Sequence, residues 1–211
     1  MKITASTLSR WSGLAAIVAG ICYVLVGLFH PLNLLASVTT PTWAFVHVLA
    51  CTMAFLGLLG LVGIYTRQVE ETGWLGLIGF AMLSLWFALV LCFSFIETLL
   101  LPILATEAPR VVDGLMAMFT GPPGIDLGML PTLWLISGPL YILGGLIFGI
   151  ATFRAGVLPR WAGALLAVGT ALAPVAALLP FEYQSKVTIP VGLALIWLGY
   201  ALWSTPRAKK A

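Results

Sequence analysis

The sequence predicts an all-α integral membrane protein, a bundle of six transmembrane helices with both termini in the cytoplasm. Hydrophobic residues make up 61% of the 211 residues and charged residues only 8%, and the mean hydropathy is +1.10. A soluble domain carries about 25% charged residues, so this composition belongs to a protein that crosses the bilayer several times. Backbone polar groups cannot stay unpaired in lipid, and apolar runs that cross it must therefore be helices.

Six apolar runs are long enough to cross the hydrocarbon core, which takes about 20 residues at about 1.5 Å each. They cover residues 11–30, 43–65, 74–101, 131–153, 161–179 and 188–203 of a single membrane domain, 1–211. The third run is long, and we expect it to tilt. The first run is too long for the apolar core of a signal peptide, and no cleavage site follows it, so we interpret it as a helix of the mature protein.

Basic residues give the orientation. Two flank the helices on one side, Arg110 and Lys186, against eight on the other: Lys2, Arg10, Arg67, Arg154, Arg160, Arg207, Lys209 and Lys210. Because cytoplasmic loops are rich in Lys and Arg, this asymmetry predicts that both termini lie inside, in a bacterial cytoplasmic membrane. We expect tryptophans at helix starts to form an aromatic belt, with Trp11, Trp74 and Trp161 at the inner interface and Trp43 at the outer one.

Glycines recur along the predicted helices, as at Gly13, Gly20 and Gly27 on the first and Gly192 and Gly199 on the last. Rows of small residues predict closely packed helices. The pair GIYTR (63–67) and GWLG (73–76) recurs as GIATFR (149–154) and RWAG (160–163). Two readings stay open, a duplicated helical hairpin and the shared demands of two inner helix starts.

Three titratable side chains fall at the same depth in the outer half of the predicted bundle. Glu97 lies about one turn from the outer end of the third helix, the first helix ends at His30, and His47 follows about one turn into the second. An ionised carboxylate in hydrocarbon costs about 2.5–3.5 kcal/mol on insertion scales, so such a residue usually has a partner or a function. The sequence therefore predicts an outward-facing polar pocket lined by His30, His47 and Glu97.

Several occupants of this pocket stay open. A small or lipophilic ligand fits a pocket with few polar groups. Imidazole and carboxylate also suit a metal ion held by His30, His47 and Glu97, and the two histidines suit a haem. The alternative without a ligand is that Glu97 is neutral and hydrogen-bonded to a neighbouring helix.

Other classes of function are disfavoured. No lysine lies in an apolar run, and no G-x-S-x-G, P-loop or dinucleotide motif occurs, so no catalytic residue is identified. No basic face suggests nucleic-acid binding. Cys22, Cys51 and Cys92 all lie in apolar runs and are interpreted as buried thiols.

The longest loop, 102–130, lies on the predicted outer side. Within it, residues 107–119 place Val111, Val112, Leu115, Met116 and Phe119 on one helical stripe. We expect a short amphipathic helix there, which either lies on the membrane surface or covers the pocket as a lid.

The segments RWSGLAAIVAGICYVLVGLFHP (10–31), YTRQVEETGWLGLIGF (65–80) and FRAGVLPRWAGALLAVG (153–169) resemble small multi-pass bacterial membrane proteins classed as domains of unknown function. That resemblance implies no activity and assigns no site residue. Three functions stay open: a ligand-binding protein, a structural or accessory subunit that docks a partner or a second copy through its glycine rows and outer loop, and a small-solute permease.

Overall fold

The computed structural model describes residues 3–176 and 178–204, and every regular element in these residues is a helix. Five helical stretches are long and apolar enough to cross a membrane: Ala5–Phe29, Pro41–Thr66, Val69–Glu107, Leu130–Ala155 and Ser185–Ser204. These are the features of a multi-pass membrane protein, and they confirm the predicted all-α class.

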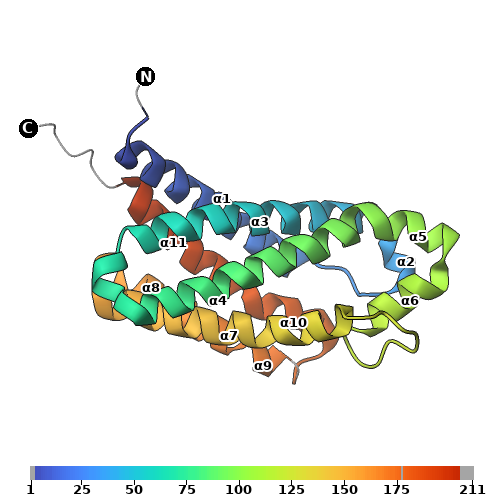
Figure 1. Ribbon diagram of the computed structural model, residues 1–211. Helices are drawn as coiled ribbons and strands as arrows, with labels where there is room; N and C mark the ends of the chain where they lie inside the picture. The colour runs from blue at the N-terminus through green and yellow to red at the C-terminus, as the bar shows by residue number, and fades with distance from the viewer. Residues whose placement is uncertain (1–2, 177, 205–211) are drawn as a thin grey trace, which may run out of the picture.

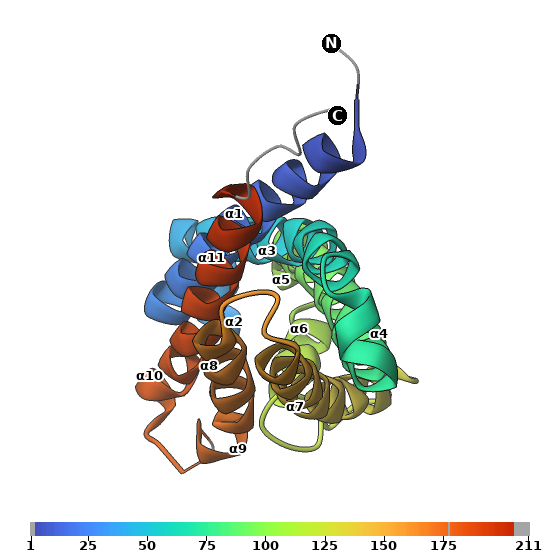
Figure 2. The same ribbon diagram turned by 90° about the vertical axis from the view of Figure 1, so that its left-hand side faces the viewer.

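The main helices close into a ring (Figures 1 and 2). Each helix packs against its two neighbours in the order α1 (Ala5–Phe29), α3 (Pro41–Thr66), α4 (Val69–Phe95), α7 (Leu130–Ala155), α8 (Arg160–Ala171) and α11 (Ile189–Ser204), which returns to α1. Neighbours run in opposite directions. On α1 and α11, Gly13 meets Gly199 and Gly20 meets Gly192, and on α7 and α8, Gly145 meets Thr170 and Gly149 meets Gly163. A ring of antiparallel neighbours places the central space of the bundle within reach of several helices at once.

The predicted count of six long helices is not confirmed in the described residues, and the exception is the segment 161–179. Its helix α8 has 12 residues, or about 18 Å at 1.5 Å per residue, which is short of the hydrocarbon thickness. Pro174 has no N–H to donate to the carbonyl of Thr170, so the regular hydrogen bonds stop there. Helix α8 ends at Ala171, and a separate turn, α9 (Ala173–Ala176), follows. The chain returns through α10 (Phe181–Gln184) and η2 (Ser185–Thr188) to α11.

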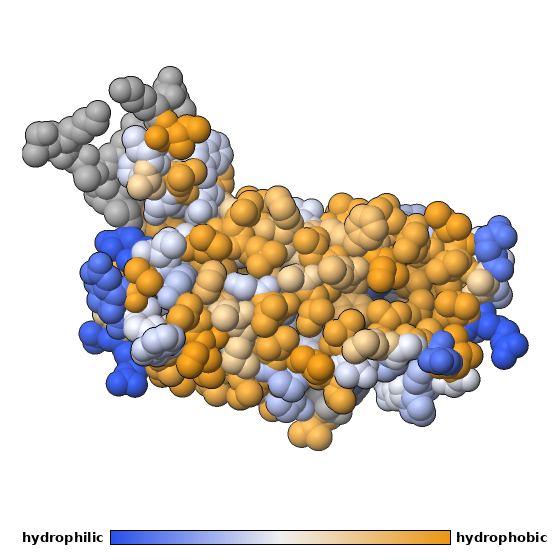
Figure 3. Space-filling view, in the orientation of Figure 1, coloured by the Kyte–Doolittle hydropathy of each residue, from blue (hydrophilic) through white to orange (hydrophobic). Residues whose placement is uncertain are grey.

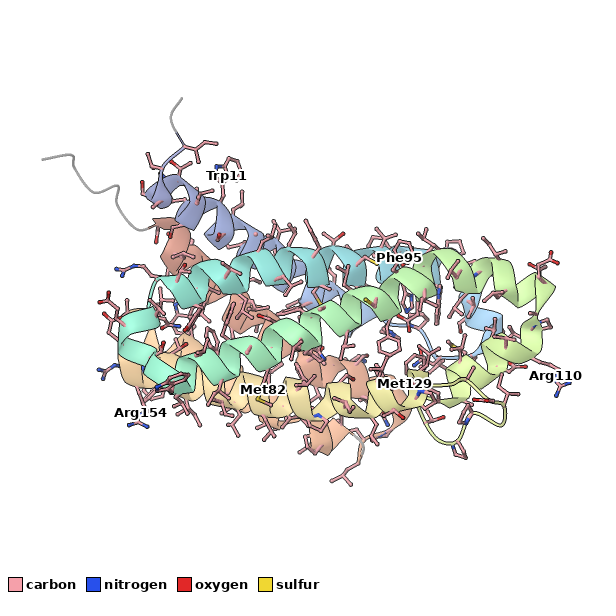
Figure 4. All side chains as sticks on the ribbon, in the orientation of Figure 1. Trp11, Met82, Phe95, Arg110, Met129 and Arg154 are labelled. Carbon is pink, nitrogen blue, oxygen red and sulfur yellow. The ribbon has the colours of Figure 1, made fainter. Side chains whose placement is uncertain are left out.

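The two ends of the bundle differ in charge, and an apolar band separates them (Figure 3). We call one end the basic end. Helix α1 begins there and α11 ends there, and the turns between helices at this end contain or adjoin Arg67, Arg154 and Arg160. At the other, the capped end, Arg110 lies on the short helix α6 (Pro109–Ala117), and Figure 4 shows Arg154 and Arg110 at opposite ends. The helix starts at the basic end carry Trp11, Trp74 and Trp161, which are exposed as a belt requires.

Helices α1 and α11 approach most closely where glycines face each other. A Cβ atom added to Gly199 would lie 2.6 Å from the carbonyl oxygen of Gly13, which is closer than any real side chain allows. Inside a bilayer hydrophobicity does not favour one helix neighbour over lipid, so close backbone contact is what holds such pairs together. The predicted glycine rows therefore serve packing within the bundle.

The third helix is longer than the predicted 74–101. It begins at Val69, turns at Gly73, where φ is +53°, and continues through a π-helical turn η1 (Ile96–Leu100) into α5 (Leu101–Glu107). The chain then reverses into α6, which starts with Pro109 at its first turn. The predicted amphipathic helix is thus present, and it buries Val112, Leu115 and Met116.

Two clusters of buried side chains fill the interior. The larger cluster occupies the basic half and the middle, and includes Leu61, Phe87, Phe148 and Leu198. The second lies at the capped end, where α6 and α2 (Leu35–Val38) bring hydrophobic side chains onto Trp43 and Phe93. Of the buried polar residues, His47 and Ser94 lie between the two clusters, whereas Gln68 and Thr152 lie at the basic end.

Candidate ligand-binding cavity

A cavity of about 210 Å³ lies between the two clusters, on the axis of the ring. Its wall comes from α1, α3, α4, η1, α7 and η2, with two side chains from the segment after α1 and one from the segment after α6. The residues that line it are Tyr23, Val26, Gly27, His30, Asn33, His47, Ala50, Met53, Trp86, Val90, Phe93, Ser94, Glu97, Phe119, Trp134, Ser185 and Thr188. Most of this surface is apolar and much of it is aromatic, so the few polar atoms determine where a polar group of a ligand would sit.

The three residues singled out in the sequence, His30, His47 and Glu97, all line this cavity. The rings of His30 and His47 meet edge to face, with centroids 5.3 Å apart. The Nε2 atom of His47 lies 3.6 Å from Oε2 of Glu97. The structure thus brings together three side chains that are up to 67 positions apart in the chain.

His47 is held in one orientation by its own helix. Its side chain is buried, its ring stacks on the indole of Trp43 at 4.0 Å between centroids, and its Nδ1 lies 2.8 Å from the Trp43 carbonyl oxygen. A carbonyl can only accept a hydrogen bond, so Nδ1 carries the proton and Nε2 of the neutral ring is an acceptor. That Nε2 atom is buried and has no hydrogen-bond partner. At 3.6 Å, Glu97 is too far away to serve as one.

Glu97 sits in the π-helical turn, and the turn explains how it is anchored. In a regular α-helix the Leu101 N–H would donate to the carbonyl of Glu97, but in η1 it donates to Ile96 instead. The carbonyl of Glu97 is therefore free, and the indole N–H of Trp43 donates to it across a distance of 2.8 Å. Pro102 follows directly and has no N–H to continue the regular ladder. Turns of this kind are frequent at functional sites.

Trp43 corrects one expectation. The sequence predicted an interfacial anchor at the outer membrane surface, yet its side chain is completely buried. It joins α3 to η1 and forms the face against which His47 packs. An indole with its N–H paired is stable in such an interior position.

His30 lies just beyond the end of α1. Its Nδ1 donates to the carbonyl of Pro31 at 2.8 Å. Burial lowers the pKa of this imidazole from its usual 6.5, and the hydrogen bond to Pro31 opposes that change. Asn33 lies nearby on the same wall of the cavity, and its buried Oδ1 has no partner.

Sequence reasoning missed the aromatic part of the wall. Tyr23 stacks on Trp86, and Trp86 contacts Tyr141, so aromatic rings form the floor toward the basic end. At the capped end Phe119 packs edge-on against Trp134, with centroids 4.6 Å apart. Phe119 was on the predicted amphipathic stripe, and it is the residue through which the loop reaches the cavity. Nothing in the apolar runs distinguishes an aromatic residue that faces the axis from one that faces lipid.

The metal and haem interpretations gain no support from this arrangement. Among the described residues, no group of three or more His, Cys, Asp and Glu side chains is arranged to hold a metal ion. Two imidazoles in edge-to-face contact at 5.3 Å leave no room for a macrocycle between them. The chemistry that the site does offer is that of a mainly apolar, aromatic cavity with one carboxyl group and unpaired acceptors.

Comparison with known proteins adds no assignment, because no protein-family model, no curated protein and no solved structure matches the chain.

Proposed function

We propose that this protein binds a small, mainly apolar molecule inside the membrane, in the cavity between α1, α3, α4, α7 and η2. One observation carries the proposal: a cavity of about 210 Å³ contains a fully buried His47 whose Nε2 has no partner, 3.6 Å from Glu97. A bundle that only had to pack would gain contacts by closing this space. Leaving a buried polar atom unpaired costs about 1–3 kcal/mol, which a ligand with a matching group would offset.

The size of the cavity suits a compact ligand. An apolar cavity of about 150 Å³ is enough to hold benzene. The cavity here is larger, and its walls are formed by rings such as Trp86, Phe93 and Trp134. A molecule with one aromatic ring and a short substituent fills such a space.

Charge supports an orientation for the site. The basic residues at the turns of the basic end favour the cytoplasmic side for that end, so we place the capped end and the cavity on the outer side of a bacterial cytoplasmic membrane. A thiol introduced by Gly121→Cys in a cysteine-free background would then react with a membrane-impermeant maleimide in intact cells, whereas one introduced by Arg67→Cys would not. The opposite pattern would reverse the orientation.

A permease is less well supported. Solute passage needs a polar route that continues from the cavity to the basic end, and below the cavity the axis is occupied by buried residues such as Leu61, Phe87 and Phe148. An accessory subunit remains an alternative, and a partner that copurifies in fixed proportion from native membranes would favour it.

The proposal is tested by measuring thermal unfolding in detergent with and without propylbenzene. Ligand that binds only the folded state raises the melting temperature. Ala50 lines the cavity, and Ala50→Phe fills part of it, whereas Ala44→Phe places the same ring on the exposed face of the same helix. We expect propylbenzene to stabilise the wild type and Ala44→Phe but not Ala50→Phe. Equal stabilisation of all three proteins, or of none, would contradict the proposal.

A further inference from the structure

Among the hydrogen-bonding groups around the cavity, several donors already have partners within the protein, whereas several acceptors have none. Four donor side chains in the cavity wall already bind carbonyl oxygens of the protein. Four such bonds join Nδ1 of His47 to Trp43, Nδ1 of His30 to Pro31, Oγ of Ser185 to Gly27 and Oγ1 of Thr188 to Ser185. Each of these bonds uses the proton of the side chain. These donors are therefore not available to a ligand.

The acceptors are left over. Nε2 of His47 and Oδ1 of Asn33 are buried without a partner. The carboxylate of Glu97, when ionised, is also an acceptor only. A ligand that pairs with these three acceptors must bring hydrogen-bond donors.

The distance between Nε2 of His47 and Oε2 of Glu97 indicates which kind of donor group a ligand would carry. Nε2 of His47 and Oε2 of Glu97 are 3.6 Å apart, too far to bond each other and close enough for one atom to bond both. A primary ammonium group carries three donors on a single nitrogen and can reach two acceptors at this separation. The aromatic rings of Tyr23, Trp86 and Trp134 in the same wall offer a surface for an apolar ring attached to that nitrogen.

The charge of the Glu97 carboxylate also favours a cationic ligand. The side chain of Glu97 is 14% exposed, and no Lys or Arg among the described residues forms an ion pair with it. An ionised carboxylate in such surroundings is costly unless a cation accompanies it. A proton on the carboxyl group can neutralise Glu97 when the cavity is empty, and the ammonium ion of a ligand can neutralise it when the cavity is occupied.

We propose, on the basis of the function proposed above, that the ligand is a small aromatic primary amine, and that its ammonium group binds between Glu97 and His47 in exchange for the proton of Glu97. The O–H bond of the Glu97 carboxyl group breaks, the proton leaves to solvent, and the ammonium ion enters with its own charge. One positive charge enters and one leaves, so the net charge of the cavity does not change. The apolar ring of the amine then occupies the aromatic part of the cavity.

The other titratable groups that line the cavity are few. His47 comes from α3, His30 from the end of α1, Tyr23 from α1 and Glu97 from η1, while the described lining residues of α4, α7 and η2 contain none. Nδ1 of His47 stays bonded to Trp43, and protonation of its Nε2 would repel an ammonium ion. The proton displaced from Glu97 is therefore expected to leave the pair altogether.

The test is isothermal titration at pH 6 with 2-phenylethylamine and propylbenzene, which have the same shape and differ in one ammonium group against one methyl group. Repeating the amine titration in buffers of different ionisation enthalpy counts the protons released. The wild type is expected to bind the amine at least tenfold more tightly than propylbenzene and to release about one proton per amine. Glu97→Gln should lower this preference at least tenfold. Glu107→Gln, which changes an exposed carboxylate on α5, should leave it unchanged.

The outcomes separate the two proposals. If propylbenzene binds and the amine has no advantage, or if the amine binds without releasing a proton, the inference about the amine is wrong and the cavity function stands. The same holds if Glu97→Gln keeps the full preference. If neither probe binds the wild type, the proposed binding function itself fails.

Discussion

The indole N–H of Trp43 donates a hydrogen bond to the main-chain carbonyl of Glu97, 2.8 Å away, and so joins α3 to the π-helical turn that carries the acid. Trp43 thus holds both polar residues of the cavity, because its indole bonds the main chain of Glu97 and also stacks on the ring of His47. The position of the polar pair thus depends on a residue that does not itself line the cavity.

Replacing Trp43 with Phe tests this relationship. The variant keeps an aromatic ring but leaves the buried carbonyl of Glu97 without a donor, which should cost about 1–3 kcal/mol of unfolding free energy. Trp11→Phe is the matched control, because Trp11 is exposed at the basic end and should change stability by less than about 0.5 kcal/mol. Equal stability of the two variants in a detergent unfolding assay would show that the bond is not important.

The glycine contact between α1 and α11 gives a second prediction. A Cβ at Gly20 would collide with the carbonyl oxygen of Gly192, so Gly20→Ala must push the two helices apart. Overpacking of this kind costs about 1–3 kcal/mol. Gly121→Ala, where the added atom meets nothing within 4 Å, should be nearly neutral. A Gly20→Ala protein as stable to heat as Gly121→Ala would mean that the helices are not in close contact.

A buried amide at the basic end gives a third prediction. Gln68 is fully buried, its Nε2 donates to Oγ1 of Thr152 on α7 at 2.8 Å, and its Oε1 has no partner. Gln68→Met removes the bond together with the unpaired oxygen, whereas Thr152→Val leaves the whole amide unpaired. Thr152→Val should therefore be the more destabilising variant, by about 1 kcal/mol or more. The reverse order in chemical unfolding would contradict this account of the loop between α3 and α4.

The pH dependence of stability gives a fourth prediction. Burial lowers the pKa of His30 in the folded protein below its usual 6.5, so the unfolded chain binds the proton more readily. The contribution of His30 to the free energy of unfolding is fully present above about pH 6.5 and decreases as the pH drops below that value. His30→Gln should lose less melting temperature between pH 8 and pH 5 than the wild type does. An equal or larger loss in the variant would show that His30 is not the group responsible.

The sequence predicted the helices and the depth of the site, but not how each helix is rotated. Hydropathy located the apolar runs, and a rise of about 1.5 Å per residue placed His30, His47 and Glu97 at one level. Helices that are apolar all round have no polar face to indicate which side meets the axis. For that reason Trp86, Phe93 and Trp134 were not recognised as cavity residues, and Trp43 was placed at the membrane surface.

Two local departures also arise from context. Pro174 lies within the apolar run 161–179, which was expected to form one helix, and in the structure α8 ends before it. The π-helical turn at Glu97 depends on Pro102 after it and on Trp43 from another helix. Pairings between helices are not visible in the spacing of one segment, so the turn could not be predicted.

The most direct test of the central claim is an X-ray structure of the protein soaked with bromobenzene, in which the bromine is located by its anomalous scattering. The account predicts a bromine peak within the cavity, between Met53, Trp86 and Phe119. An empty cavity, with bromine only on the surfaces of the helices that face lipid, would contradict it.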